Sequence, residues 1–373
     1  MAVLRPTALR RRDGPSSLRW RRRHTHADRS SAELSFVKTS KLQTLNTLKP
    51  HQRCRPDGEL DTSLADPTAS LRGCYNLPSD YAENRGLLRA YLELLRPPNV
   101  VTAIADVLAG YAVAGRAQPR ALPWLIAASV CLYAGGVVLN DFFDRGIDAI
   151  ERPERPIPSG RVSAARAAVL GVVLLVAGIG AAAAASRVSA GVASAIVACV
   201  LLYDARAKRH AVAGPICMGV CRGLNLLLGV SVEPAVLGAR WPIGLLSVVY
   251  IAAVTTVSRG EVHGGRTGIA TFALISLGLV LAGLTAVALD SSTGRFWALV
   301  LVGVLAYRVL PPYWQVRKDP QPAVIRRAVK AGVLSLVLLD AIIGAAYAGP
   351  IYAAIILATG VVAGSLARLF SVT

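Results

Sequence analysis

Ten long apolar runs fill the chain after about residue 98, and they limit the folds it can adopt more than any other feature. They lie near 99–116, 121–141, 164–185, 188–204, 214–232, 241–257, 268–289, 294–310, 328–348 and 350–370. Each approaches the roughly 20 residues that a helix needs to cross a bilayer. Hydrophobic residues make up 54% of the 373, and the mean hydropathy is +0.49, too apolar for a water-soluble domain. The runs predict an all-α membrane bundle of nine to ten transmembrane helices, because Gly349 and Pro350 could also kink one long terminal helix.

Basic residues are spread unevenly over the connections between these runs. The connections after the second, fourth, sixth and eighth runs are rich in Lys and Arg, whereas those after the odd-numbered runs hold few. Lys and Arg accumulate on the cytoplasmic side of membrane proteins. We therefore expect a multi-pass protein of the cell (inner) membrane, embedded in the lipid bilayer, with these four connections in the cytoplasm.

Residues 1–80 differ in composition from the rest of the chain. They are polar, broken by Pro and Gly, and carry two arginine triplets, at residues 10–12 and 21–23. Such a composition predicts a disordered basic extension, followed by a transmembrane domain over about residues 85–373. The net charge of +19 comes from this extension and from the loops. Because no folded recognition motif accompanies it, we expect no nucleic-acid binding.

The most informative segment is NDFFDRGIDAIERPERPIPSGR, from Asn140 to Arg161, at the end of the second run. Asp141, Asp144 and Asp148 are spaced three and four residues apart, so they share one face if the helix continues through them. Like charges so close repel unless a cation joins them. Oxygen ligands, with Asn140 beside them, suit Mg²⁺, which commonly binds one or two carboxylates plus substrate phosphates.

The second half of this segment is basic and cannot form a helix. Three prolines and Gly160 predict a stiff loop at the membrane surface. Arginine presents a planar fork that matches phosphate oxygens. We therefore expect the loop to bind a diphosphate through Arg152, Arg155 and Arg161. An ordinary solvated loop is the alternative.

Two more connections on the same predicted side carry unusual residues. After the fourth run, Tyr203 is a possible diphosphate hydrogen-bond donor and Lys208 a possible phosphate ligand, although the stretch could instead be a simple positive-inside anchor. After the sixth run, Arg259 is a further diphosphate candidate and Glu261 could complete a metal shell, with an ordinary turn as the alternative. Asp204 or Glu261 could also act as a general base that removes a proton from an acceptor substrate.

Polar residues inside the apolar runs are costly and tend to face cavities or each other. Asn99 and Asp106 lie two helical turns apart on the first run, and Arg222 and Asn225 share a face of the fifth. These four residues are candidates for an acceptor pocket. An ion pair between Asp106 and Arg222 that only stabilises the bundle is equally compatible with the sequence.

With these motifs in view, the chain resembles the UbiA superfamily of intramembrane prenyltransferases over about residues 85–373. The family motif NDxxDxxxD stands at Asn140 to Asp148, RPIPSG follows from Arg155, and the YxxxxK element stands at Tyr203 and Lys208. Within the superfamily, the stretches ERPERPIPSGRVS and KRHAVAGPICMGVCRGLNLLLG look most like the EboC-like branch. The resemblance implies an all-helical bundle with a central cavity and a cytoplasmic cap formed by three loops.

The resemblance also implies an activity: Mg²⁺-dependent transfer of a prenyl group from an isoprenyl diphosphate to an acceptor that the sequence does not name. Its catalytic residues would be Asp141, Asp144, Asp148 and Lys208. The family's second aspartate motif, usually DxxxD, is replaced here by Ser258, Arg259 and Glu261, which puts a second metal in doubt. A non-catalytic prenyl-diphosphate or lipid binder, or a transporter component, is the alternative. A CDP-alcohol phosphotransferase is disfavoured, because its DGxxAR motif is missing.

Overall fold

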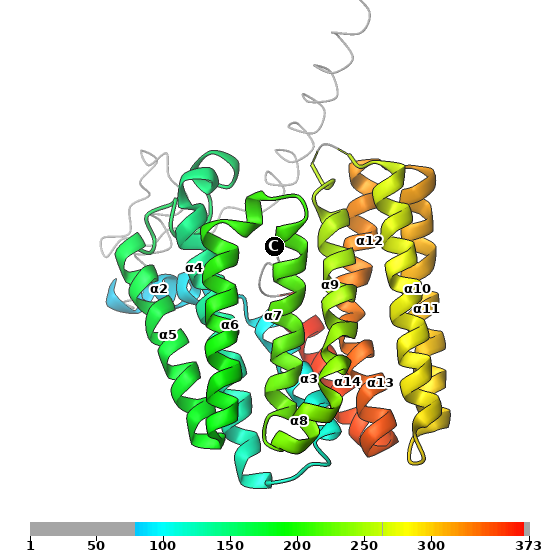
Figure 1. Cartoon of the computed structure of the whole chain (residues 1–373). Helices are drawn as coiled ribbons and strands as arrows, with labels where there is room; N and C mark the ends of the chain where they lie inside the picture. The colour runs from blue at the N-terminus through cyan, green and yellow to red at the C-terminus, as the bar shows by residue number, and fades with distance from the viewer. Residues whose placement is uncertain (1–78, 263, 369–373) are drawn as a thin grey trace, which may run out of the picture. The chain divides into compact units, whose positions relative to one another are not determined.

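The computed structural model describes residues 79–262 and 264–368, and every regular element in that part of the chain is a helix. The predicted all-α fold is therefore confirmed. The predicted basic extension falls on residues outside the described part, apart from its last two positions, so it stays a prediction. From Ser79 onward the chain forms one unit, drawn in Figure 1.

The helices follow the predicted apolar runs. In chain order they are α2 (Ser79–Leu95), α3 (Pro97–Val113), α4 (Leu122–Glu151), α5 (Ala164–Ala185), α6 (Arg187–Ala205), α7 (Ala213–Val230), α8 (Pro234–Arg240), α9 (Gly244–Ser258), α10 (Thr267–Asp290), α11 (Arg295–Lys318), α12 (Pro322–Leu334), α13 (Leu336–Ala348) and α14 (Pro350–Leu366), with short 3₁₀ turns η1 (Pro119–Ala121), η2 (Ala207–Arg209) and η3 (Trp241–Ile243).

Eight segments of the described chain are long and apolar enough to cross a membrane. They correspond to the predicted runs from the second to the ninth, with α8 and α9 in one segment and α12 and α13 in another. The two remaining runs form α3 and α14, which have 17 residues each and are shorter than the roughly 20 that span a bilayer directly. With α3 and α14 added, the eight segments of the described chain make ten, the upper end of the predicted nine to ten.

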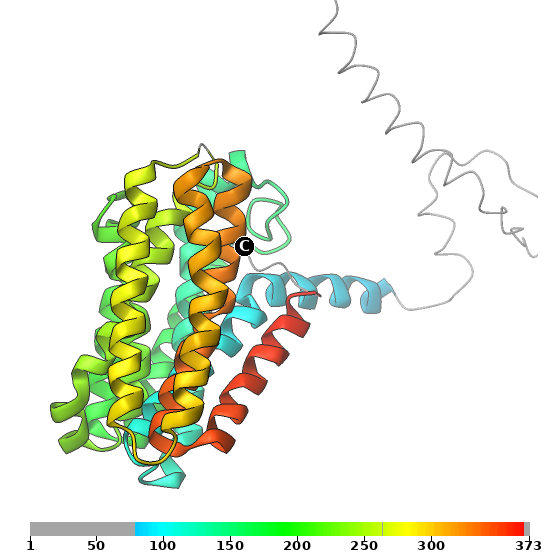
Figure 2. The same cartoon turned by 90° about the vertical axis from the view of Figure 1, so that its right-hand side faces the viewer.

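The last two helices form a hairpin. Gly349 has a φ of 86°, a conformation that favours glycine, and Pro350 is the first residue of α14. α13 and α14 pack against each other, and Figure 2 shows α14 returning along the bundle from the turn. The alternative of one kinked terminal helix is therefore wrong, because the chain reverses at Gly349.

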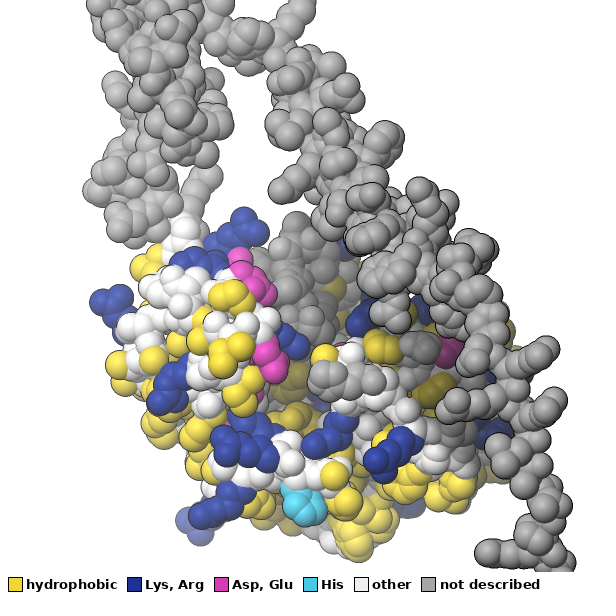
Figure 3. Space-filling view, turned by 90° about the horizontal axis from the view of Figure 1, so that it is seen from above, with side chains coloured by type: hydrophobic (Ala, Val, Ile, Leu, Met, Phe, Trp, Pro, Cys, Tyr) yellow, Lys and Arg dark blue, Asp and Glu magenta, His cyan; other side chains and the backbone are white. Residues whose placement is uncertain are grey.

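The connections after α4, α6 and α9 all lie at one end of the bundle, at the top of Figure 1. This arrangement follows from the alternating direction of successive helices. The prediction that the three unusual connections share one side is confirmed. Figure 3 looks onto this end, where the charged side chains in view are mostly Lys and Arg, lying among hydrophobic ones, with few acidic side chains.

Helices α3 and α7 approach each other closely at two glycines. A Cβ atom on Gly110 would lie 1.9 Å from the carbonyl oxygen of Leu226, and one on Gly229 would lie 2.2 Å from that of Val107. Small residues allow such contact between helices in a bilayer, where packing drives association. The contact fixes α3 against α7.

Gly110→Ala should therefore lower the thermal unfolding temperature of the purified protein. The added methyl group must push α3 and α7 apart, at a cost of about 1–3 kcal/mol, or roughly 3–10 °C. Gly180→Ala in α5 is the matched control, since a Cβ atom added there would meet nothing within 4 Å. Equal unfolding temperatures for the two variants would refute the close α3–α7 contact.

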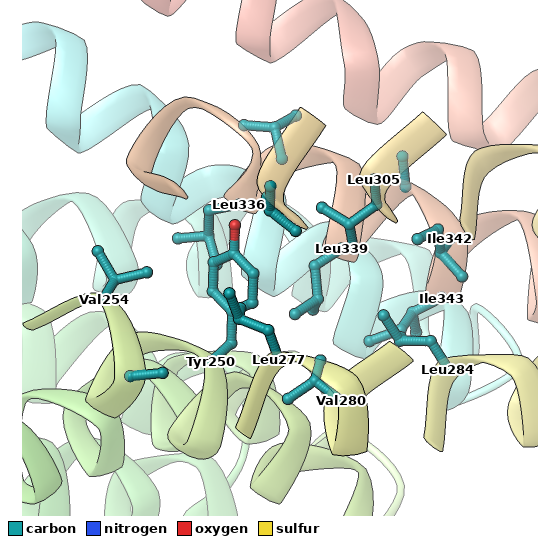
Figure 4. Close-up of a cluster of buried hydrophobic side chains, with 14 of the residues drawn as sticks. Tyr250, Val254, Leu277, Val280, Leu284, Leu305, Leu336, Leu339, Ile342 and Ile343 are labelled. Atoms are coloured by element: carbon teal, nitrogen blue, oxygen red, sulfur yellow. The ribbon is translucent and has the colours of Figure 1, made fainter. Parts of the chain in front are cut away.

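The half of the bundle farther along the chain has its own apolar core. Figure 4 shows Tyr250 of α9 among aliphatic side chains of α10, α11 and α13, including Leu277, Leu305 and Leu339. The Tyr250 hydroxyl donates a 2.7 Å hydrogen bond to the carbonyl oxygen of Gly332. This core supports α9, from which the third charged connection leaves.

Candidate active site

Helix α4 carries the three aspartates. It continues past the apolar run to Glu151, so Asp141, Asp144 and Asp148 lie on one continuous helix and share a face, as their spacing predicts. Asp141 and Asp148 are buried, and Asp144 is half-buried. The helix ends at Arg152, where the predicted proline-rich loop begins.

Two arginines pair with the aspartates of α4. Arg155, from the proline-rich loop, places Nη1 at 2.7 Å from Oδ2 of Asp148 and 3.3 Å from Oδ1 of Asp141. Arg96 places Nη2 at 2.6 Å from the same Asp141 oxygen. The structure thus brings the predicted Arg155 to the predicted carboxylates and adds Arg96 to them.

Sequence reasoning did not assign Arg96 to the site. It is the residue before α3 and has a φ of 49°, which is uncommon for a residue other than glycine. Burial lowers the pKa of the guanidinium, and the charge of Asp141 opposes that shift. An arginine directly before Pro97 and Pro98, at the start of an apolar run, was the available signal.

The connection between α6 and α7 supplies a lysine. Lys208 lies in η2 and places Nζ at 2.6 Å from Oδ1 of Asp144, although the direction of this contact is not that of a hydrogen bond. The same Nζ lies 3.8 Å from Oδ1 of Asp204, the buried residue next to Tyr203 near the end of α6. Lys208 therefore lies beside the aspartate cluster, and its role as a phosphate ligand stays a prediction.

Arg259 joins the connection between α9 and α10 to the connection between α6 and α7. Its Nη1 donates to the carbonyl oxygens of Lys208 and His210, both at 3.3 Å. Glu261 is half-buried, and its carbonyl oxygen accepts a hydrogen bond from Arg326. Burial raises the pKa of the Glu261 carboxyl, and the charges of Arg326 and Arg152 oppose that shift. Arg326 and Arg152 are therefore the basic neighbours of Glu261.

Three other predicted residues lie in the proline-rich loop, on α6 and on α4. Arg161 is exposed and donates 2.6 Å to Glu93 of α2 and 2.7 Å to the carbonyl oxygen of Glu154, so it secures the loop. Tyr203 and Asn140 are half-buried, on α6 and α4.

The predicted acceptor residues form a tight network. Arg222 of α7 places Nε at 2.7 Å from Oδ2 of Asp106 on α3, and both side chains are buried. Asn225 donates 2.8 Å to the same oxygen and accepts 2.8 Å from Ser129 of α4. The predicted ion pair is therefore present. Asn99, half-buried, lies two turns nearer the aspartate cluster.

A small cavity lies beside the connection between α9 and α10. Its volume is about 150 Å³, and its lining includes Arg259, Arg266, Gly264, Val257 and Ile325. Arg259 thus contributes both to this cavity and to the contact with the connection between α6 and α7. The cavity therefore borders the basic end of the bundle.

The chemistry of the aspartate cluster fits a hard divalent cation. Its donors are carboxylate oxygens, and neither oxygen of the buried Asp204 has a hydrogen-bond partner among the described groups. Each aspartate of α4 instead contacts a basic side chain. Within the described ranges, no three His, Cys, Asp or Glu side chains are grouped closely enough to hold a metal by themselves. Substrate oxygens would therefore be needed to complete a metal shell.

Comparison with known proteins decides the family. Residues 103–334, more than half of the chain, match the UbiA prenyltransferase family. The chain belongs to this family. The predicted resemblance is confirmed at this level, and with its apolar helices the chain is an integral, multi-pass membrane protein.

Several curated relatives share the name digeranylgeranylglyceryl phosphate synthase. The one from Methanopyrus kandleri is 36% identical over 156 residues, which cover 41% of this chain and 57% of that protein. The one from Methanothrix thermoacetophila is 35% identical over 211 residues, covering 51% and 76%. The matches thus span between about half and three quarters of these relatives.

Two solved structures share the fold. A digeranylgeranylglyceryl phosphate synthase structure superposes with a TM-score of 0.55 at 23% identity, covering 69% of this chain and 98% of that one. A UbiA homolog from Aeropyrum pernix K1 gives 0.54 at 16% identity, covering 66% and 96%. At these identities the likeness concerns the fold alone.

Proposed function

We propose that this protein transfers a prenyl group from an allylic diphosphate to an acceptor in the membrane, with Mg²⁺ bound at the aspartate cluster. The observation that carries the proposal is the set of ion pairs among Asp141, Asp144, Asp148, Arg155 and Lys208 at one end of apolar helices. Charged groups at such a position are costly and mark chemistry or transport. The UbiA family match favours chemistry.

The same residues account for diphosphate binding. Asp141, Asp144 and Asp148 would hold the metal, with Asn140 beside them, and bound Mg²⁺ would neutralise the charge of the departing diphosphate. Arg155 and Lys208, which now contact these carboxylates, would turn to the diphosphate oxygens.

Prenyl transfer also requires that water be kept from the allylic carbon. The helices below the cluster are lined mainly by Ala, Val and Leu, which offer no nucleophile to an allylic cation. We place the cluster on the cytoplasmic side, because the connections at that end carry most of the loop Lys and Arg. The isoprenoid tail would then extend into the bundle from that side.

For the acceptor, we propose an alcohol on a glyceryl phosphate lipid. The support is the shared name of the relatives, whose product carries two geranylgeranyl groups on glyceryl phosphate. Arg259 and Arg266 beside the 150 Å³ cavity provide positive charge for a second phosphate near the aspartate cluster. Membership of the EboC-like branch remains a prediction. The names of the relatives favour a glyceryl phosphate acceptor instead.

The test uses the purified protein in lipid nanodiscs with radiolabelled geranylgeranyl diphosphate. Offered geranylgeranylglyceryl phosphate, it should release pyrophosphate and form a labelled lipid product, and EDTA should stop both, with Mg²⁺ restoring them. 4-Hydroxybenzoate serves as the contrasting aromatic acceptor. Transfer to the aromatic acceptor alone would refute the acceptor class. Tight diphosphate binding with no transfer to either acceptor would favour the non-catalytic binder.

A further inference from the structure

Asp204 is a buried carboxylate whose two oxygens have no hydrogen-bond partner in the part of the chain that the structure describes. Its residue is only 4% exposed. Removing a carboxylate from water is costly unless hydrogen bonds, a basic group or a metal compensate it. The nearest compensation is the Nζ of Lys208, at 3.8 Å, one helical turn along the chain. That distance leaves Asp204 poorly satisfied.

The charges around Asp204 do not balance. Lys208 lies closer to Asp144, at 2.6 Å, than to Asp204. The charges of both Asp144 and Asp141 also act on Asp204. The ion pairs described for this site join four carboxylates, those of Asp141, Asp144, Asp148 and Asp204, with only three basic side chains, those of Arg96, Arg155 and Lys208. Asp204 shares Lys208 with the nearer Asp144 and has no hydrogen-bond partner among the described groups, so a bound cation would compensate its charge.

Glu261 does not have this need. It is less buried than Asp204, and the charges of Arg326 and Arg152 already act on it. Glu261, in the loop where the family's second aspartate motif usually stands, is therefore a weaker candidate for a metal ligand than the more buried Asp204. The Asp204 carboxylate, near the end of α6, is available as a ligand in place of Glu261.

We infer that Asp204 is a metal ligand, which together with Asp144 holds a divalent cation of the Mg²⁺ class, while diphosphate oxygens complete the shell. This inference rests on the proposed function. The position of Lys208 Nζ, in contact range of both carboxylates, shows that a single cation can approach the two. One or two carboxylates with substrate phosphates are a common Mg²⁺ shell. With a cation on these two carboxylates, Lys208 would be free to contact the diphosphate.

The competing role is positional. Asp204 and Lys208 are four residues apart, and the carboxylate could simply hold the ammonium in place. The two roles differ in what happens without metal. If Asp204 only positions Lys208, its removal should weaken diphosphate binding even in EDTA. If Asp204 is a metal ligand, its removal should not weaken binding in EDTA, because without metal the Asp204 carboxylate only repels the diphosphate.

The experiment measures binding of Mn²⁺, as a probe for Mg²⁺, to the full-length protein in nanodiscs with inorganic pyrophosphate. Free Mn²⁺ is followed by electron paramagnetic resonance. Asp204→Asn should weaken Mn²⁺ binding roughly tenfold or more, and Glu261→Gln, the matched control, should change it less than about twofold. In EDTA, Asp204→Asn should bind pyrophosphate as well as the wild type or better.

Opposite results overturn the inference. Unchanged Mn²⁺ binding by Asp204→Asn, an equal loss in Glu261→Gln, or weaker pyrophosphate binding by Asp204→Asn in EDTA would each exclude the ligand role. Asp204→Ser, measured in the same way, decides the matter if the asparagine variant does not fold. If the wild type binds Mn²⁺ through Asp204 but never releases pyrophosphate from an allylic diphosphate, the proposed function fails and the metal site remains.

Discussion

Asp144→Ala is expected to reduce Mg²⁺-dependent pyrophosphate release by about 100- to 1,000-fold, the usual effect of removing one group that stabilises developing charge. Asp144 contacts Lys208 at 2.6 Å and lies at the middle of the three α4 aspartates. On the proposed function, its loss removes a ligand of the metal, and it leaves Lys208 with the more distant Asp204. The measurement is initial-rate pyrophosphate release in nanodiscs at saturating allylic diphosphate and Mg²⁺.

Asp290→Ala is the control for this substitution. Asp290 ends α10 at the opposite end of the bundle, its side chain is 75% exposed, and it contacts Arg240 at 3.7 Å. Its removal should leave the rate unchanged. If Asp144→Ala and Asp290→Ala retained equal rates, the aspartate cluster would not be the site of diphosphate ionisation.

Arg222→Met should destabilise the protein strongly, by about 3–5 kcal/mol, because it leaves the fully buried Asp106 carboxylate without its basic partner. A second buried acid, Asp340 of α13, also acts electrostatically on Arg222. The thermal unfolding temperature in detergent should fall by roughly 6–20 °C.

Two variants test the physical cause. Asp106→Asn combined with Arg222→Met removes both charges and should recover part of the lost stability, since an unpaired buried charge costs more than a missing ion pair. Arg240→Met removes the exposed partner of Asp290 and should shift the unfolding temperature very little. An Arg222→Met protein as stable as Arg240→Met would mean that the α3–α7 network does not stabilise the bundle.

Local sequence patterns predicted the helices and most of the aspartate cluster. The apolar runs fix where helices cross the membrane, and the spacing of Asp141, Asp144 and Asp148 fixes their common face once α4 continues to Glu151. The prolines after Arg152 end that helix and place Arg155 beside the same face. These features depend on residues close in the chain, so the sequence is sufficient for them.

The partners of these residues depend on contacts between segments far apart in the chain. Arg96 reaches Asp141 from the start of α3, and Arg259 reaches the backbone of the Lys208 connection from the end of α9. The sequence could propose both Asp204 and Glu261 as carboxylates near the site, but not which of them lacks compensation. That depends on burial and on which basic side chains lie nearby.

The sequence by itself determined that this is an all-helical membrane protein with an acidic, metal-suited helix end and basic loops on one side. Hydrophobic length and helical spacing are local properties, and they are sufficient for those conclusions. Only the tertiary structure decided that Asp106 and Arg222 form an ion pair, that the Glu261 carbonyl oxygen accepts a hydrogen bond from Arg326, and that the buried Asp204 carboxylate lacks a hydrogen-bond partner among the described groups. The physical reason is that the cost of a buried charge depends on its neighbours in space, which the packing of α3, α4, α6 and α7 brings together.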